Sequence, residues 1–371
     1  MPEAVPAPDD APAAGHETVP EPVRALGGTP WAGRDAAEAQ RITAGQLGEA
    51  HWPVLPELPD RGPGADAVGR SAALLAELSV DLQPHGWRVS PPAAVASGMD
   101  RRRARSWWRE DAHRWADTVA AAGAVTERLA VRVLGPLTLL GSLWLPGGER
   151  VLVDAGARRD VAEAHREGLA EALAELRAAT GAARLGVVLD EPLAAPVLAG
   201  ELATASGYRT VRSMPRDEAR AAWRAALADL LGAGADHVWL DPHARDADVR
   251  DLALLTAESL PPEPGAVALT LGVGGLEAPS PAAATAAPAT PAAWEVVAGW
   301  AEAGRGLALA PAGVGPLRPA DVLATWDRLG LDPALARGLV LTARGRHDGH
   351  VLARLRTDAG ELGSRIDDEI G

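Results

Sequence analysis

GVVLDEPLAAP, residues 186–196, is the stretch that decides the fold of this chain. It begins with a short apolar run that contains two β-branched valines, which is typical of a buried strand and too short for a helix. Asp190 and Glu191 follow where the strand ends, and Pro192 prevents its hydrogen-bond ladder from continuing. Two carboxylates at the carboxyl end of a buried strand indicate either the site of an α/β barrel or an ordinary solvated turn.

The alternation of short apolar runs and helical segments continues on both sides of this stretch. Segments 158–179 and 216–231 carry apolar residues at helical spacing, whereas 237–240, 266–273, 307–310 and 339–342 have the length and composition of strands. Roughly eight strand–helix units in one chain favour a closed (β/α)8 TIM-type barrel over an open doubly wound sheet. No G-x-G-x-x-G motif follows a strand, which argues against a dinucleotide-binding fold.

Outside these units, composition suggests how the rest of the chain is organised. Residues 1–22 form an acidic Pro/Ala-rich tail that we expect to be disordered, and residues 23–371 form the single barrel domain. An N-terminal loop and helix extension comes before the regular alternation, and its proline-rich segment 52–64 predicts an ordered loop. Segment 129–145, where the regular alternation begins, reads as one strand-like segment. The low-complexity segment 278–293, APSPAAATAAPATPAA, predicts a mobile loop.

Composition also excludes several functions. Apolar residues make up 47% of the chain, the net charge is −14 and the pI is about 5.1, so we expect neither a nucleic-acid nor a membrane partner. The first twenty residues lack the basic start and apolar core of a signal peptide, which predicts a cytoplasmic protein. Cysteine is absent, which removes disulfides, cysteine nucleophiles and thiolate metal sites.

Several blocks of the sequence resemble the catalytic domain of the cobalamin-independent methionine synthase family, particularly its short actinobacterial branch. They occur in the family's order between residues 25 and 201 and include ALGGTPW, LPELPDRGPGADAVGRSAALL, VDLQPHGWR and VVLDEPLAAPVLAGE. The resemblance implies a (β/α)8 barrel and a zinc ion. It also implies methyl transfer from a methylated folate, 5-methyltetrahydrofolate, to the sulfur of homocysteine, so that the partner is a small amino-acid-like substrate.

The resemblance further implies where the substrate binds. Asp190, in the D-E-P motif, matches an aspartate that contacts the substrate, and such a carboxylate can hold an amino group as a charge-assisted pair. The turn at Gly27 and Gly28 matches the carboxylate-binding turn, with Gly28 standing where the family has serine. Glu191 is a further candidate for substrate binding, although neighbouring residues of an extended chain point to opposite faces.

The zinc site is where the sequence departs most from the family. The family holds zinc with a His-x-Cys pair, a carboxylate and a second cysteine, whereas the corresponding segments here, HVWLDPHAR and LTARGRHDGH, contain no cysteine. Asp241, His243, His347 and His350 follow two predicted strands and could form a zinc site without sulfur. The alternative is that these histidines are ordinary loop residues.

Two functions therefore remain open at the level of sequence. The first is a methionine-synthase-like methyltransferase with an atypical or absent metal. The second is a non-catalytic barrel that keeps the fold and a cleft for an amino-acid-like ligand. Function depends on the site rather than on the fold, so the arrangement around Asp190 decides between them.

Overall fold

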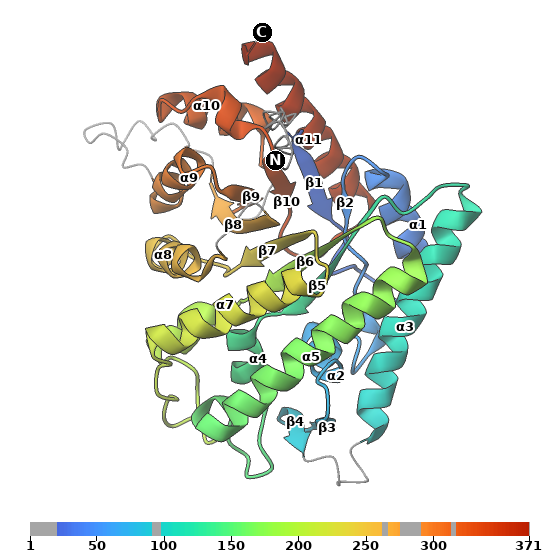
Figure 1. Ribbon diagram of the computed structural model, residues 1–371, viewed down its shortest axis with the longest axis vertical. Coiled ribbons are helices and arrows are strands. Elements are labelled where there is room, and N and C mark those ends of the chain that lie inside the picture. Colours follow the sequence, from blue (N-terminus) through green and yellow to red (C-terminus); the bar gives the residue numbers. More distant parts are fainter. Residues whose placement is uncertain (1–20, 91–97, 262–265, 275–290, 313–316, 371) are drawn as a thin grey trace, which may run out of the picture.

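A computed structural model describes residues 21–90, 98–261, 266–274, 291–312 and 317–370 of the chain. Eight parallel strands form a ring with helices around it (Figure 1), in the order β2-β1-β10-β9-β8-β7-β6-β5. Val54, directly after β2, forms a bridge to Ala130 of β5 and closes the ring. The predicted (β/α)8 barrel is therefore confirmed.

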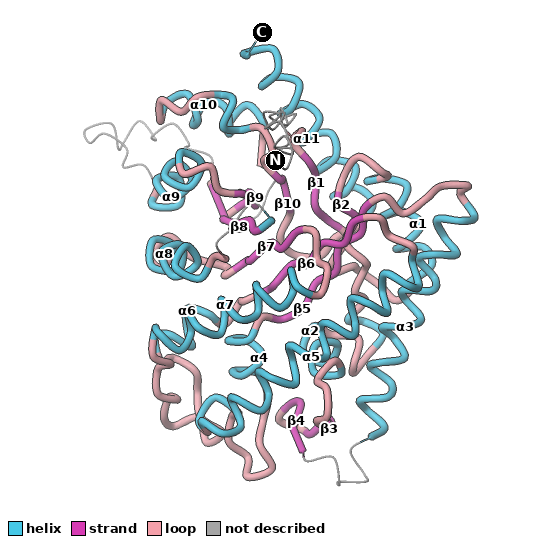
Figure 2. The backbone as a smooth tube through the Cα atoms, in the orientation of Figure 1, coloured by secondary structure: helices cyan, strands magenta, loops and turns pink. Residues whose placement is uncertain are grey.

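Figure 2 shows the strands at the centre and the helices outside them. The barrel strands are β1 (Arg24–Gly27), β2 (Trp52–Pro53), β5 (Arg128–Leu134), β6 (Arg184–Asp190), β7 (His237–Asp241), β8 (Val267–Val273), β9 (Gly306–Pro311) and β10 (Val340–Thr342). The helices are α1 (Ala36–Leu47), α2 (Ala67–Ala73), α3 (Gly98–Ala121), α4 (Pro136–Ser142), α5 (Ala155–Thr180), α6 (Ala194–Ala199), α7 (Arg216–Gly232), α8 (Val249–Ser259), α9 (Ala292–Glu302), α10 (Pro319–Arg328) and α11 (Gly349–Ile370). An antiparallel hairpin of β3 (Ser79–Gln83) and β4 (Gly86–Ser90) lies outside the ring.

The prediction of a loop over 52–64 is wrong at its start, because Trp52–Pro53 is a barrel strand. Proline is tolerated there because the residues after it supply the hydrogen-bond donors. The N–H of Val54 donates to the Gly27 carbonyl at 2.7 Å, and the N–H of Leu55 donates to the Ala130 carbonyl at 2.8 Å.

The prediction of one strand-like segment over 129–145 is also wrong beyond Leu134, since Pro136–Ser142 forms α4. Proline suits the first position of a helix, where its missing N–H would have no partner within the helix. The next two N–H groups donate to the carboxylate of Glu191, which follows β6. A residue distant in sequence thus caps this helix.

Two other expectations fall mostly outside the described residues. Of the tail 1–22, the structure describes Glu21 and Pro22, and of the loop 278–293 it describes residues from 291, with α9 beginning at Ala292. Among the described helices, none combines the length and the apolar character needed to cross a membrane.

The barrel interior is filled at its amino-terminal half by tryptophan. Trp52 and Trp239 lie with ring centroids 5.0 Å apart and planes at 73°, inside a cluster that includes Ala130 and Ala308. Small residues on the surrounding strands leave room for these rings. At Gly186 an added Cβ would lie 2.4 Å from a ring carbon of Trp239. Glycine in β6 is therefore a packing requirement.

We predict that Gly186→Ala lowers the free energy of unfolding by about 1–3 kcal/mol, because the methyl group overpacks the tryptophan layer. Urea unfolding monitored by tryptophan fluorescence measures this change. Gly45→Ala in α1 is the matched control, since a Cβ there meets nothing within 4 Å and alanine favours a helix. Equal stability of Gly186→Ala and the wild type would contradict this account of the core.

Candidate functional site

Every second residue of a barrel strand faces the axis, and this alternation builds the site. In β6, Gly186 and Val188 face inwards, so Asp190 at the strand end does too. Further inward-facing polar residues stand on β5, β7, β8 and β10. Together they line a cavity of about 170 Å³ at the carboxyl ends of the strands, the mouth cavity, whose polar side chains are Thr29, Arg132, Asp190, Asp241, His243, Thr270, Thr342, Arg344 and His347.

Asp190 is held by two neighbours that use both of its oxygens. Arg132 donates from Nε to Oδ2 at 2.8 Å, and its Nη2 donates to the same oxygen. His243 Nε2 lies 2.6 Å from Oδ1. Burial opposes the charged form, but the bond from His243 and the Arg132 charge prevail and keep the pKa of Asp190 below its usual value. Asp190 is therefore an ionised carboxylate whose hydrogen-bonding capacity is already engaged.

Asp241 is paired with a second guanidinium. Arg344, two residues beyond β10, donates from Nη2 to Asp241 Oδ1 at 2.8 Å. The same oxygen accepts the backbone N–H of His243 at 3.0 Å, which supports the left-handed backbone of that residue (φ 47°). Asp241 Oδ2 lies 3.7 Å from His243 Nε2, beyond hydrogen-bond distance. Burial raises the pKa of Asp241 despite the opposing charges of His243 and Arg344.

His243 lies between the two carboxylates. Its Nδ1 lies 3.2 Å from Arg344 Nη1, a group that can only donate, so the neutral ring carries its proton on Nε2 and donates to Asp190. Burial alone would lower the pKa of His243, but the hydrogen bond to Asp190 and the charge of Asp241 outweigh it and raise the pKa. The site therefore holds a histidine that takes up a proton more readily than usual.

Buried ion pairs connect the N-terminal extension to the residues that line the mouth cavity. Arg132 Nη1 lies 3.5 Å from Glu57, whose other oxygen lies 3.6 Å from Arg70 Nε. Asp111 of α3 accepts bonds from Arg70 at 2.8 Å and from Arg61 at 2.7 Å. Charges of alternating sign thus run from α3 to β6, so the extension is part of the support of the site.

Three side chains at the mouth lie close enough together to be considered as metal ligands. Ligand atoms of Asp190, Asp241 and His243 lie within 4.8 Å of one another, which is close enough to surround one ion. However, each carboxylate already pairs with a guanidinium, and His243 Nε2 faces Asp190 rather than an open position. A zinc ion placed here would face two fixed positive charges and would find no thiolate donor, so the residues present do not fit zinc.

The turn after β1 differs from the interaction that the resemblance implies. Gly27 lines the mouth cavity, but the N–H of Gly28 donates to Nδ1 of His347 at 2.8 Å, so this amide already has a partner. Gly28 has a φ of 134°, and a Cβ there would lie 2.3 Å from the Val54 carbonyl oxygen. Glycine is thus required by the backbone at this position.

The remaining predicted site residues, His347, His350 and Glu191, lie outside the group formed by Asp190, Asp241 and His243. His347 is 2% exposed, and its Nε2 lies 3.3 Å from the Ala343 carbonyl, so both ring nitrogens connect backbone segments. His350 is exposed at the start of α11, outside the group that could surround an ion. Glu191 points away from the mouth cavity and accepts hydrogen bonds from two N–H groups of α4 and from Trp223 Nε1 at 2.7 Å. Burial raises the pKa of Glu191 to about 7.

Arg132, Thr270 and Arg344 belong to the site but were not predicted from the sequence. The sequence does contain a feature that marks each of these three residues as facing the barrel interior. Arg132 interrupts an apolar strand, and its position relative to Ala130 places it inside the barrel. Thr270 has the same relation to Ala268, and Arg344 continues the inward series of β10. A two-residue period applied from each strand end would have found all three.

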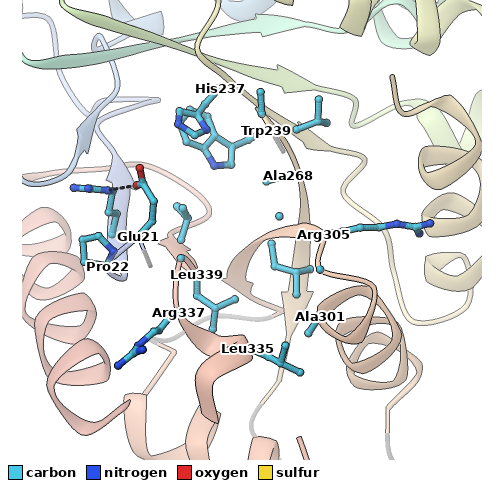
Figure 3. Close-up of a pocket in the computed structure, with 18 of the residues that line it drawn as sticks. Glu21, Pro22, His237, Trp239, Ala268, Ala301, Arg305, Leu335, Arg337 and Leu339 are labelled. Carbon is cyan, nitrogen blue, oxygen red and sulfur yellow. Dashed lines mark hydrogen bonds and ion pairs between the residues drawn. The ribbon is translucent and has the colours of Figure 1, made fainter. Parts of the chain in front are cut away.

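A larger cavity of about 350 Å³ lies at the opposite end of the barrel (Figure 3). His237 and Trp239 form one side of it, Ala268 and Leu339 lie along it, and Glu21 pairs with Arg24 at its edge at 3.2 Å. This cavity surrounds the amino-terminal ends of the strands, whereas barrel chemistry takes place at the carboxyl ends. The mouth cavity is therefore the candidate site.

Known proteins resemble this chain only weakly. No protein-family model matches the chain, and no curated protein matches its sequence. A B12-independent methionine synthase from Shewanella sp. W3-18-1 is 15% identical, with 76% of this chain and 70% of that chain covered and a TM-score of 0.41. Old Yellow Enzyme from Pichia sp. AKU4542 is 12% identical, with 91% and 81% covered and a TM-score of 0.42. A morphinone reductase is 12% identical, with 91% and 84% covered and a TM-score of 0.41. Similarities at this level identify neither a family nor an activity.

We predict that His347 makes stability fall in acid. Burial lowers its pKa from 6.5 to about 4, so between these values the unfolded chain binds a proton that the folded chain does not. The free energy of unfolding should therefore drop by up to about 3 kcal/mol as pH falls through this window. Glu191 contributes the opposite slope between pH 4.5 and 7, because its pKa is raised.

Urea unfolding of His347→Gln and wild type from pH 4 to 7 isolates the contribution of His347. We expect the variant to lose this part of the pH dependence, whereas the exposed control His350→Gln should keep it. The same slope in His347→Gln and wild type would show that His347 is not the group responsible.

Proposed function

We propose that this chain is a methionine-synthase-like barrel that binds a small amino-acid-like zwitterion at the mouth cavity without a metal ion. The observation that carries the proposal is the pairing of Asp190 and Asp241 with Arg132 and Arg344, all of which line that cavity. Side chains of both signs face a single small space. A ligand with one positive and one negative group matches such a wall better than a singly charged ligand.

The size and walls of the cavity support the same ligand class. Its volume of about 170 Å³ is below the roughly 300–1,000 Å³ of pockets for drug-sized molecules, so it suits a small metabolite. Leu26, Val54 and Val188 give it an apolar side that could accept a short aliphatic side chain. Asp241 Oδ2 is the carboxylate oxygen at the mouth with the most capacity for an ammonium group.

Zinc-dependent methyl transfer from 5-methyltetrahydrofolate to homocysteine is the second candidate, and the grouping of Asp190, Asp241 and His243 is the observation that favours it. Thiol substrates need activation to the thiolate, which zinc supplies in that chemistry. We assign the lower rank to this activity because a metal ion would have to displace both guanidinium groups from their carboxylates.

Isothermal titration with L-methionine and L-homocysteine, each with and without EDTA, tests the proposal. We expect saturable binding of at least one of them that EDTA leaves unchanged. Asp241→Asn should weaken that binding about tenfold or more, because it removes the charge opposite the amino group. The solvent-exposed variant Asp217→Asn in α7 is the control. Methyl transfer that EDTA abolishes, or no binding of either compound, would overturn the proposal.

A further inference from the structure

Two hydrogen-bond donors at the mouth cavity have no partner among the described residues. Thr270 is 2% exposed, and its Oγ1 is buried without a hydrogen bond. The Nε of Arg344 is also buried without one, although the two Nη atoms of this guanidinium are engaged by Asp241 and His243. Buried polar groups left unpaired cost roughly 1–3 kcal/mol each, so a ligand that brings an acceptor to either donor in this cavity would gain a hydrogen bond that the protein alone lacks.

The path of Arg344 across the mouth places its guanidinium near β8, the strand that carries Thr270. Its side chain starts beyond β10 and reaches Asp241 at the end of β7, and so passes the end of β8. A Cβ at Gly272 of β8 would lie 3.7 Å from the guanidinium carbon of Arg344. Thr270 precedes Gly272 by two residues and therefore faces the same side of the strand.

The chemistry of the donors defines what they would bind. An arginine Nε can only donate, and a threonine hydroxyl can donate to a second acceptor atom. Two donors beside a guanidinium charge match the two oxygens of a carboxylate. A dianionic phosphate matches less well, because the ionised Asp190 lines the same cavity.

We propose that Thr270 and Arg344 form the carboxylate subsite of the ligand that binds at the mouth cavity. This inference rests on the proposed function and adds to it the position of the negative group. The carboxylate binds on the β8 and β10 side of the mouth, with the amino group near Asp241 Oδ2. The turn after β1 is not used, because the N–H of Gly28 is bound by His347.

Isothermal titration with L-methionine tests the subsite through a pair of substitutions. Thr270→Val keeps the shape of the side chain and removes the hydroxyl, and we expect it to raise the Kd about tenfold. Thr270→Ser restores the hydroxyl and should bind within about twofold of wild type. Thr256→Val, in α8, is the matched control, because that buried threonine bonds to the Leu252 carbonyl away from the mouth. Its Kd should equal that of wild type.

A second ligand separates a carboxylate contact from a general effect on the cavity. 3-Methylthiopropylamine has the side chain and amine of methionine but no carboxylate. Wild type should bind it at least tenfold more weakly than L-methionine, and Thr270→Val should not weaken it further. Equal losses for both ligands, or wild-type affinity of Thr270→Val for L-methionine, would overturn the subsite while leaving the proposed function intact. Binding of neither L-methionine nor L-homocysteine to wild type would overturn both proposals, and if L-homocysteine alone binds, the comparison of Thr270→Val with wild type is made with that ligand.

Discussion

The pairing of two buried carboxylates with two guanidinium groups is the interaction on which the rest of this site depends. Removing a charge from water costs several kcal/mol, and the cost is offset only if its partner stays in hydrogen-bonding geometry. Arg132 and Arg344 provide that geometry for Asp190 and Asp241. Loss of either arginine would leave a buried carboxylate with only His243 to offset its charge. The four charged residues must therefore be kept together for the fold to be stable, and they also form the surface that a ligand would contact.

The barrel interior has an apolar layer at the amino-terminal ends of the strands and a charged layer at their carboxyl ends. Trp52 and Trp239 fill the amino-terminal half, where Gly186 makes room for them, and the charged side chains begin at Arg132 and continue to the strand ends. An apolar floor below the ion pairs strengthens them, because fewer water molecules can screen the charges. The residues that stabilise the barrel and those that could bind a ligand therefore form successive layers of the same strands.

The sequence predicted the barrel because its signals are local. An apolar run such as 186–189 and a helical stripe such as that of 158–179 need no knowledge of distant residues. The two-residue strand β2 was missed because its pairing depends on Gly27 and Ala130, which are distant in sequence. Asp190, Asp241 and His243 were recognisable as residues that follow strands. Their arginine partners were not, since Arg344 reaches Asp241 across 103 positions of the chain. The partner of Gly28 is similarly remote, because His347 lies 319 positions away.

Guanidinium groups occupy both carboxylates that a metal ion would need. Zinc titration against a chromophoric chelator, with metal analysis of the dialysed protein, tests this claim most directly when wild type and the double variant Arg132→Met/Arg344→Met are compared. Methionine is similar in length to arginine but carries no charge, so the two substitutions free Asp190 and Asp241 beside His243. We predict substoichiometric zinc in wild type and gain of a zinc site in the double variant. One tightly held zinc ion per wild-type chain, lost on Asp190→Asn, would contradict it.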